Sequence, residues 1–250
     1  MSNNTHTVIV TGASMGLGYA IAEAFLEDCS NVVINGSDAV RLQAAEKRLS
    51  AIGRVASVVG SVDDTSTGAR LAETALAAFG RADVLVNNAG IFSPKPFLDV
   101  DEADPDSFLG VNLKGTYFTA QAVIPIMQRQ GGGSIINIGT VLTQHGLAGF
   151  PATAAVASKG AVHALTIQLA AEFAADNIRV NTIAPGVIRT PIHARNGIED
   201  VDSLAGLHLL NRVGEAAHIA EAVLHLAKAD FTTGLTYNLD GGHVAGHMLG

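Results

Sequence analysis

A glycine-rich segment near the beginning of the chain has the spacing of a phosphate-binding loop. Residues 11–18 read TGASMGLG and lie between a β-branched run and a helix-forming stretch. Gly12 permits a tight turn, while Gly16 and Gly18 let the backbone approach a phosphate closely. The helix that follows contributes the amides and the positive potential of its first turn. An isolated glycine motif also fits an ordinary turn between a strand and a helix, so its interpretation depends on other segments.

A second segment of small residues supports a nucleotide site. Asn87, Asn88, Ala89 and Gly90 follow the fourth apolar run of the chain. Open parallel sheets bind ligands beyond the carboxyl ends of their strands, and small residues at that edge leave room for an adenosine. The two segments together predict a bound nucleotide.

The elements that must position these segments follow a regular alternation. Short β-branched runs predict strands at residues 7–11, 32–34, 55–59, 84–86, 134–138, 179–183 and 235–239. The stretches between them predict helices at residues 18–27, 39–52, 71–79, 108–129, 156–175 and 216–227. This alternation predicts an α/β fold, a Rossmann-like doubly wound parallel sheet of about seven strands with helices on both faces. Residues 189–210 have weak periodicity, and we interpret them as a mobile lid.

Composition excludes several classes of protein. A length of 250 residues suits one α/β domain spanning residues 1–250. Hydrophobic residues make up 48% of the chain, but no run is long enough for a membrane span. The start, MSNNTHT, lacks the features of a secretory signal, so we expect a cytoplasmic protein. A net charge of −8 without a basic run argues against a nucleic acid partner. We expect the single cysteine, Cys29, to be buried, and the histidine spacing predicts no metal site.

The motifs taken together resemble the short-chain dehydrogenase/reductase family, and the resemblance runs from about Thr7 to Gly242. The family's TGxxxGxG pattern is present at residues 11–18 and its NNAG pattern at residues 87–90. Further matches are the asparagine in VNLKG, the pair Ser158-Lys159 and the turn Pro185-Gly186. The resemblance implies an oxidoreductase that moves hydride between a nicotinamide dinucleotide and a small organic substrate.

The resemblance also implies which residues hold the cofactor. Ser61, Val62 and Asn88 would flank the adenosine, and Lys159 would bind the ribose. Ile188 and Thr190 would meet the nicotinamide amide. The full expected set is Gly12, Ser14, Met15, Gly16, Leu17, Gly18, Ser37, Ser61, Val62, Asn88, Ala89, Gly90, Lys159, Pro185, Gly186, Ile188 and Thr190.

The sequence departs from the family in its catalytic set of asparagine, serine, tyrosine and lysine. The matching positions are Asn112, Thr140, Ala155 and Lys159. Thr140 keeps a hydroxyl, but Ala155 removes the phenol that lies one helical turn before the lysine. The spacing from Thr140 to Ala155 is also two residues longer than is usual in the family. Loss of a proton donor lowers the rate of carbonyl reduction by roughly 10²–10⁴.

Three explanations for Ala155 remain open at this point. It can be an engineered change, or the substrate can be an iminium, which accepts hydride without a simultaneous protonation. Alternatively, another residue donates the proton. His145 is the leading candidate because an imidazole suits proton transfer, although a solvated loop histidine is the ordinary alternative. Thr153 and His193 are weaker candidates.

These considerations favour an imine reductase, with carbonyl reduction as the other enzymatic possibility. One alternative is a catalytically impaired, engineered carbonyl reductase, and the alternative from a different class is a non-catalytic NADP-binding protein. We expect the substrate pocket to be built from residues 93–100, 139–155 and 189–210, whose sequence does not identify the substrate.

The cofactor and the oligomeric state are further expectations. We expect NADP(H) rather than NAD(H), because the second strand is followed by Ser37 without the carboxylate that usually binds a ribose hydroxyl. Met15 and Asp38 argue for NAD(H), which stays possible. The apolar helices at residues 108–129 and 156–175 predict a homo-oligomer, a tetramer or a dimer.

Overall fold

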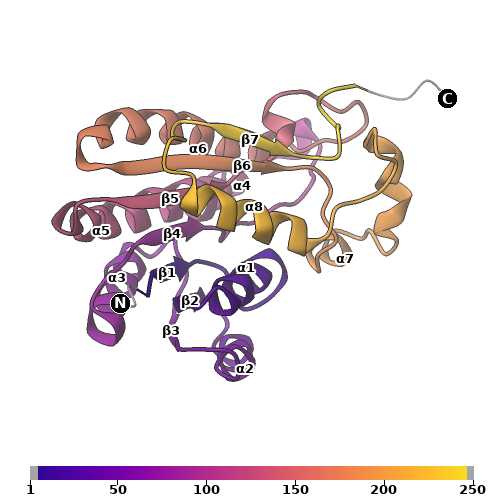
Figure 1. Cartoon of the computed structure of the whole chain (residues 1–250). Coiled ribbons are helices and arrows are strands. Elements are labelled where there is room, and N and C mark those ends of the chain that lie inside the picture. The colour runs from indigo at the N-terminus through magenta and orange to yellow at the C-terminus, as the bar shows by residue number, and fades with distance from the viewer. Residues whose placement is uncertain (1–4, 247–250) are drawn as a thin grey trace.

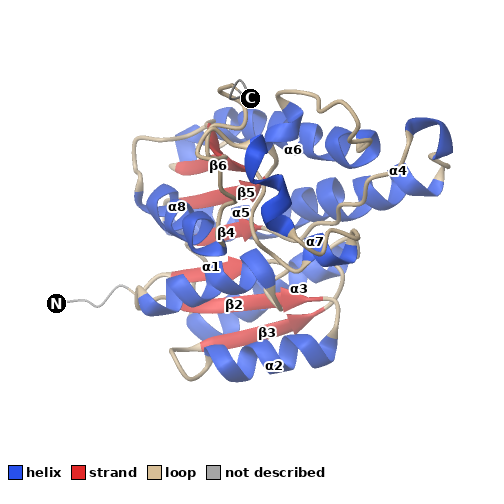
Figure 2. Ribbon diagram, turned by 90° about the vertical axis from the view of Figure 1, so that its right-hand side faces the viewer, coloured by secondary structure: helices blue, strands red, loops and turns tan. Residues whose placement is uncertain are grey.

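The computed structural model of the chain describes residues 5–246, apart from the side chain of Arg195. Seven parallel strands form one sheet in the order β3-β2-β1-β4-β5-β6-β7. The strands are β1 (Thr7–Val10), β2 (Asn31–Gly36), β3 (Val55–Val59), β4 (Val84–Asn87), β5 (Gly133–Ile138), β6 (Ile178–Pro185) and β7 (Thr236–Leu239). Helices cover both faces of the sheet (Figures 1 and 2). The Rossmann-like architecture expected from the alternation of strands and helices is therefore confirmed.

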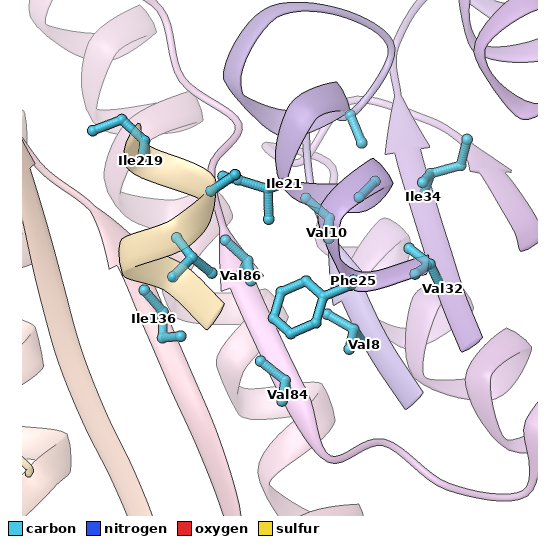
Figure 3. Packing of buried hydrophobic residues seen from close by; sticks show 14 of the residues in the cluster. Val8, Val10, Ile21, Phe25, Val32, Ile34, Val84, Val86, Ile136 and Ile219 are labelled. Atoms are coloured by element: carbon cyan, nitrogen blue, oxygen red, sulfur yellow. The ribbon is translucent and has the colours of Figure 1, made fainter. Parts of the chain in front are cut away.

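Side chains alternate between the two faces of each strand and so form two cores. One core places Val8 and Val10 of β1 against Ile21 and Phe25 of α1 (Gly16–Glu27) and Ile219 of α8 (Ala216–Lys228), as Figure 3 shows. The other core packs Ile9 and its neighbours against α3 (Thr65–Phe79), α5 (Gly115–Gln130) and α6 (Thr153–Glu172). The helix α2 (Ala39–Leu49) joins the first core at the edge of the sheet.

Several boundaries differ from the expectation, and each difference has a local cause. The helix α3 begins six residues before the predicted start because the Asp64 carboxylate accepts a hydrogen bond from the Ser66 amide and caps the helix. The predicted helix at residues 108–129 is wrong as a single element. It divides into α4 (Ala103–Phe108), a π-helical turn (Leu109–Lys114) and α5. Such turns are frequent at functional sites.

The expected burial of Cys29 is also wrong. Cys29 is exposed and has a φ of 63°, because it lies in the turn that reverses the chain between α1 and β2. The segment interpreted as a lid contains the short helix α7 (Ile192–Arg195) and a 3-10 segment (Val201–Leu207). No helix within residues 5–246 is both long and apolar enough to cross a membrane.

Candidate active site

A cleft of about 450 Å³ lies at the carboxyl edge of the sheet, where the loops after β1 to β6 converge. It brings together every residue of the expected cofactor set except Gly18. These residues are Gly12, Ser14, Met15, Gly16, Leu17, Ser37, Ser61, Val62, Asn88, Ala89, Gly90, Lys159, Pro185, Gly186, Ile188 and Thr190. Residues from six loops therefore line a single cavity.

The glycines of the first loop are required for different structural reasons. Gly12 and Gly16 have φ angles of 64° and 59°, a conformation that favours glycine. A Cβ atom on Gly18 would lie 2.4 Å from the carbonyl oxygen of Gly12. Gly18 therefore allows the helix to pack against its own loop, whereas Gly16 forms part of the wall of the cleft.

The first turn of α1 is open to a ligand. Met15, at its N-cap, makes no side-chain hydrogen bond to the helix, whereas Asp38 and Asp64 cap α2 and α3 with their carboxylates. No acidic residue lies in the first turn of α1. The amides and the dipole of this turn thus lie at the cleft without an acidic side chain in the same turn, which suits a pyrophosphate.

Thr11 connects the glycine loop to the segment after β4. Its Oγ1 atom accepts hydrogen bonds from the amides of Asn88 and Ala89, both at 3.0 Å. In return, the Asn88 side chain donates to the carbonyl oxygens of Thr11 and Gly12, at 2.9 and 3.1 Å. This reciprocal arrangement holds the two loops at a fixed separation on either side of the cleft.

Arg41 lies at the end of the cleft next to Ser37. Its Nε atom donates to the Asp38 carboxylate at 2.8 Å, and its Nη1 atom approaches the Met15 sulfur at 3.8 Å. The hydrogen bonds from Arg41 hold the pKa of Asp38 below its usual range. The sequence reasoning missed Arg41, although its position three residues after a capping aspartate was a usable signal.

The cleft fits a nicotinamide dinucleotide by its own geometry. It has an uncapped helix terminus for the pyrophosphate, a guanidinium at the edge formed by β2, and a lysine at the opposite end. A Cβ atom on Gly90 would lie 3.2 Å from the Lys159 Nζ atom, so the absence of a side chain there leaves the lysine accessible.

Lys159 is held in place by the end of β5. Its Nζ atom donates a hydrogen bond to the carbonyl oxygen of Ile138 at 2.6 Å. Burial lowers the pKa of Lys159 to about 8 from the ordinary value of 10.5. Burial and the charge of Lys159 also lower the pKa of His163, one helical turn later, which favours a neutral imidazole. Lys159 thus changes its protonation state at a pH much closer to neutral than an ordinary lysine does.

Asn112 is buried in the π-helical turn behind the cleft. Its Oδ1 atom accepts from the Ile91 amide at 2.8 Å, and its Nδ2 atom donates to the Ile91 carbonyl and to Ser158 Oγ. Ser158 Oγ donates in turn to the carbonyl oxygen of Ala155. The Asn112 side chain therefore fastens the segment after β4 to helix α6, next to Lys159.

Thr140 lies where the cofactor cleft meets a second cavity. It is the N-cap of a 3-10 turn (Val141–Thr143), and its Oγ1 atom accepts from the Leu142 amide at 3.3 Å. The hydroxyl can still donate to a substrate oxygen. Thr140 and Lys159 are thus the members of the expected catalytic set that line the cavities.

Ala155 has a different environment. It is 1% exposed and lines neither the cofactor cleft nor the second cavity. The chain has three tyrosines, Tyr19, Tyr117 and Tyr237, and all of them lie outside both cavities. The second cavity instead has Phe150 in its wall, a residue of the lengthened loop that precedes Ala155.

The histidines considered as proton donors occupy different places. His145 lines neither cavity, and its ring lies 4.6 Å from the ring of His243. His193 and His243 line the second cavity. His193 Nε2 lies 2.8 Å from the carbonyl oxygen of Ile188. His243, near the end of the chain, carried no signal in the sequence.

The second cavity has a volume of about 320 Å³ and adjoins the cofactor cleft. Phe92, Thr140, Pro185, Gly186 and Ile192 line both spaces. The other walls come from Pro94, from residues 141–150 and 187–207, and from His243, so the three expected loops do contribute to it. Its position beside Thr140 identifies it as the candidate substrate pocket.

Comparisons with known proteins agree with this geometry. A family model described as "Enoyl-(Acyl carrier protein) reductase" matches residues 12–243. The chain is 34% identical over 239 residues to the 3-oxoacyl-[acyl-carrier-protein] reductase FabG of Thermotoga maritima, covering 94% of this chain and 96% of that protein. It is 34% identical to the NADP-dependent (R)-specific alcohol dehydrogenase of Lentilactobacillus kefiri, covering 95% and 96%. The crystal structure of L-sorbose reductase from Gluconobacter frateurii with NADPH and L-sorbose superposes with a TM-score of 0.88 at 28% identity, covering 97% of both chains.

Proposed function

Because the chain belongs to the short-chain dehydrogenase/reductase family of NAD(P)-dependent oxidoreductases, we propose that it reduces the carbonyl group of a small organic substrate. The observation that carries this proposal is the position of Thr140 at the junction of the two cavities, with Lys159 in the wall of the same cleft. A nicotinamide dinucleotide, when bound, supplies the hydride. The residues of this chain must then orient the carbonyl and manage the charge on its oxygen.

Thr140 and Lys159 divide these tasks. The Thr140 hydroxyl donates a hydrogen bond to the substrate oxygen and orients it. The Lys159 ammonium stabilises the negative charge that develops on this oxygen. With a pKa of about 8, Lys159 also acts as the proton source, directly or through Thr140 or a water molecule. The proton leaves Lys159 Nζ for the substrate oxygen and is then replaced from solvent.

Imine reduction is the second candidate. It is favoured by the observation that no tyrosine lines either cavity, since an iminium needs no acid during hydride transfer. The charge of the site opposes it, because the Lys159 ammonium repels an iminium and the substrate pocket has no described carboxylate. We therefore place carbonyl reduction first, which changes the order expected from the sequence.

We further propose NADP(H) as the preferred cofactor. Arg41 and Ser37 line the end of the cleft where the adenosine ribose would lie. A guanidinium suits a 2′-phosphate, and it already offsets the carboxylate of Asp38. NAD(H) binding would instead require Asp38 to turn from Arg41 to the ribose hydroxyls.

A spectrophotometric assay tests the reaction class. NADPH consumption at 340 nm is measured with ketones and with cyclic imines of matching shape. Faster turnover of the ketones supports the proposal, and faster turnover of the imines supports the second candidate. Tight NADPH binding without turnover of any substrate favours a non-catalytic dinucleotide-binding protein.

The remaining expectations are proposals about the state of the protein. We propose a cytoplasmic homo-oligomer, a tetramer or a dimer, whose subunits each form one domain over residues 1–250. The support is apolar exposure on the two helices expected at the interface, since Tyr117 is 46% and Ile167 60% exposed. Light scattering that gives the mass of a monomer at micromolar concentration would contradict the oligomer.

A further inference from the structure

The wall of the candidate substrate pocket is mainly apolar. Most of its wall is aliphatic or aromatic, with Phe92, Val141, Leu142, Leu147, Phe150, Val187, Ile192, Ile198, Leu204 and Leu207. No lysine, arginine, aspartate or glutamate is among the residues found to line it, the side chain of Arg195 lying outside the described part. An ionised group entering this pocket would lose water without gaining an ion pair with a lysine, arginine or carboxylate side chain of the described wall.

The polar side chains in the pocket wall are few. Thr140 and Asn196 are uncharged, and His193 and His243 are the imidazoles. The contact between His193 Nε2 and the Ile188 carbonyl makes this nitrogen the donor, so a neutral ring presents Nδ1 as an acceptor. These groups can orient one or two hydrogen-bonding atoms of a substrate, but none of them is a lysine or arginine that would supply a permanent positive charge to a carboxylate or a phosphate.

Phe92 and Phe150 form an aromatic pair in the wall of the pocket. Their rings are almost parallel, at an angle of 11°, with centroids 5.8 Å apart. Phe92 lines both cavities, and Phe150 lies in the lengthened loop before α6. Backbone hydrogen bonds from Phe150 to Leu147 and from Lys95 to Pro151 hold this loop in place. The pair thus offers a fixed aromatic surface beside Thr140.

Two cations next to these loops are already committed to carboxylates. Lys95 pairs with Asp101 and Asp104. Arg189, which follows Ile188 of the cleft, pairs with Asp202 and Glu215. A phosphate-bearing carrier, such as coenzyme A or an acyl carrier protein, would have to compete with these ion pairs. The surroundings of the pocket therefore disfavour an anionic carrier as well as an anionic substrate.

From these observations we infer that the pocket takes an uncharged, mainly apolar ketone or aldehyde that is free rather than bound to a carrier, with its apolar part against Phe92 and Phe150. This inference rests on the proposed carbonyl reduction and specifies its substrate class. The pocket volume of about 320 Å³ lies at the small end of the range for small-molecule sites, roughly 300–1,000 Å³. A compact substrate with one or two rings suits it.

Matched substrate pairs test the inference on the enzyme saturated with NADPH. One pair is an aryl alkyl ketone and the same ketone with a carboxylate on the ring. The other is a 3-oxoacyl group carried on N-acetylcysteamine or on coenzyme A. We expect kcat/KM to be at least about tenfold higher for the uncharged member of each pair. Equal or higher values for the charged members would overturn the inference.

Two phenylalanine variants test the wall itself. Phe150→Ala is expected to lower kcat/KM for the aryl ketone about tenfold and that for butanone less than about threefold, because only the larger substrate reaches the ring. Phe97→Ala is the matched control, since Phe97 is 68% exposed and lines neither cavity. Equal losses for both ketones in Phe150→Ala would overturn the role of Phe150.

Calorimetric binding to the protein saturated with NADP⁺ separates this inference from the proposed function. If no ketone is reduced, but the uncharged ketone binds more tightly than its carboxylate analogue and Phe150→Ala weakens it, the proposed function fails and the pocket assignment stands. If ketones are reduced and the charged analogue binds as tightly, the pocket assignment fails and the function stands. Absence of binding by either compound also overturns the pocket assignment.

Discussion

The ammonium nitrogen of Lys159 donates a hydrogen bond of 2.6 Å to the carbonyl oxygen of Ile138, the last residue of β5. This contact ties helix α6 to the carboxyl edge of the sheet, in the wall of the cofactor cleft that Thr140 also lines. It also keeps a cation in a half-buried position where, among the described residues, the Ile138 carbonyl oxygen is its one hydrogen-bond acceptor. The properties of the site therefore depend strongly on the protonation of Lys159.

The rate of carbonyl reduction should follow the charge of Lys159. Since its pKa is about 8, the protonated form predominates below that pH, and kcat/KM should fall as the pH rises above about 8. Lys159→Met should lower kcat by roughly 10²–10⁴ and remove this limb of the profile. A pH profile of the initial rate at saturating NADPH measures both effects. An unchanged limb in Lys159→Met would show that another group titrates.

The stability of the cofactor-free protein should rise with pH between about 8 and 10.5. In this window the unfolded chain keeps the Lys159 proton, whereas the folded protein, with a pKa of about 8, has released it. The lowering of the Lys159 pKa makes the unfolding free energy about 3 kcal/mol smaller below pH 8 than above pH 10.5. Urea denaturation across this range measures the slope.

The matched variant for this titration is Lys159→Met, which should lack the rise and be more stable at pH 7. Tyr19 acts in the opposite direction, because burial raises its pKa and stability then falls as the pH passes its ordinary value of 10. The difference between the wild-type protein and the variant removes the contribution of Tyr19. If the unfolding free energies of the two proteins changed with pH in parallel, the burial of the Lys159 charge would be contradicted.

Arg41 should decide the choice between NADPH and NADH. Arg41→Ala is expected to raise KM for NADPH at least about tenfold and to change KM for NADH less than about threefold, because only NADPH carries the 2′-phosphate. Arg129→Ala is the control, since Arg129 is exposed on α5 and does not line the cleft. Equal effects on both cofactors would contradict phosphate recognition by Arg41.

Ala155→Tyr should not simply restore a family active site. Ala155 is 1% exposed, so a phenol at this position must displace its neighbours, at a cost of about 1–3 kcal/mol in unfolding free energy. Ala157→Tyr, at an exposed position of the same helix, should change stability by less than about 1 kcal/mol. Thermal denaturation compares the two variants. A stable Ala155→Tyr protein with increased ketone activity would contradict this expectation.

His145→Ala distinguishes Lys159 from the histidine first considered as the proton donor. Because His145 lines neither cavity, its removal should change ketone turnover less than about threefold. Loss of its ring contact with His243 should still lower stability by about 0.5–1.5 kcal/mol. A loss of turnover of about 10²-fold, together with loss of a limb of the pH profile, would restore His145 as the acid.

The sequence by itself determined the features that depend on neighbouring residues. Runs of β-branched residues predicted all seven strands, with every boundary within two residues, because strand preference and alternation are local properties. Gly12 and Gly16 indicated the nucleotide loop because their backbone angles suit glycine whatever surrounds them. The match of Lys159 to a known motif likewise required only its place next to Ser158 in the sequence.

Only the tertiary structure decided how these parts work together. The π-helical turn at Asn112, the burial of Ala155 and the lowered pKa of Lys159 all depend on contacts between segments far apart in the chain. The same holds for Phe92 and Phe150, which belong to different loops and meet only in the pocket wall. Periodicity reports which face of an element is buried, but it does not report what lies against that face. Desolvation and cavity shape are set by those neighbours, and so the chemistry of the site became visible only in the folded chain.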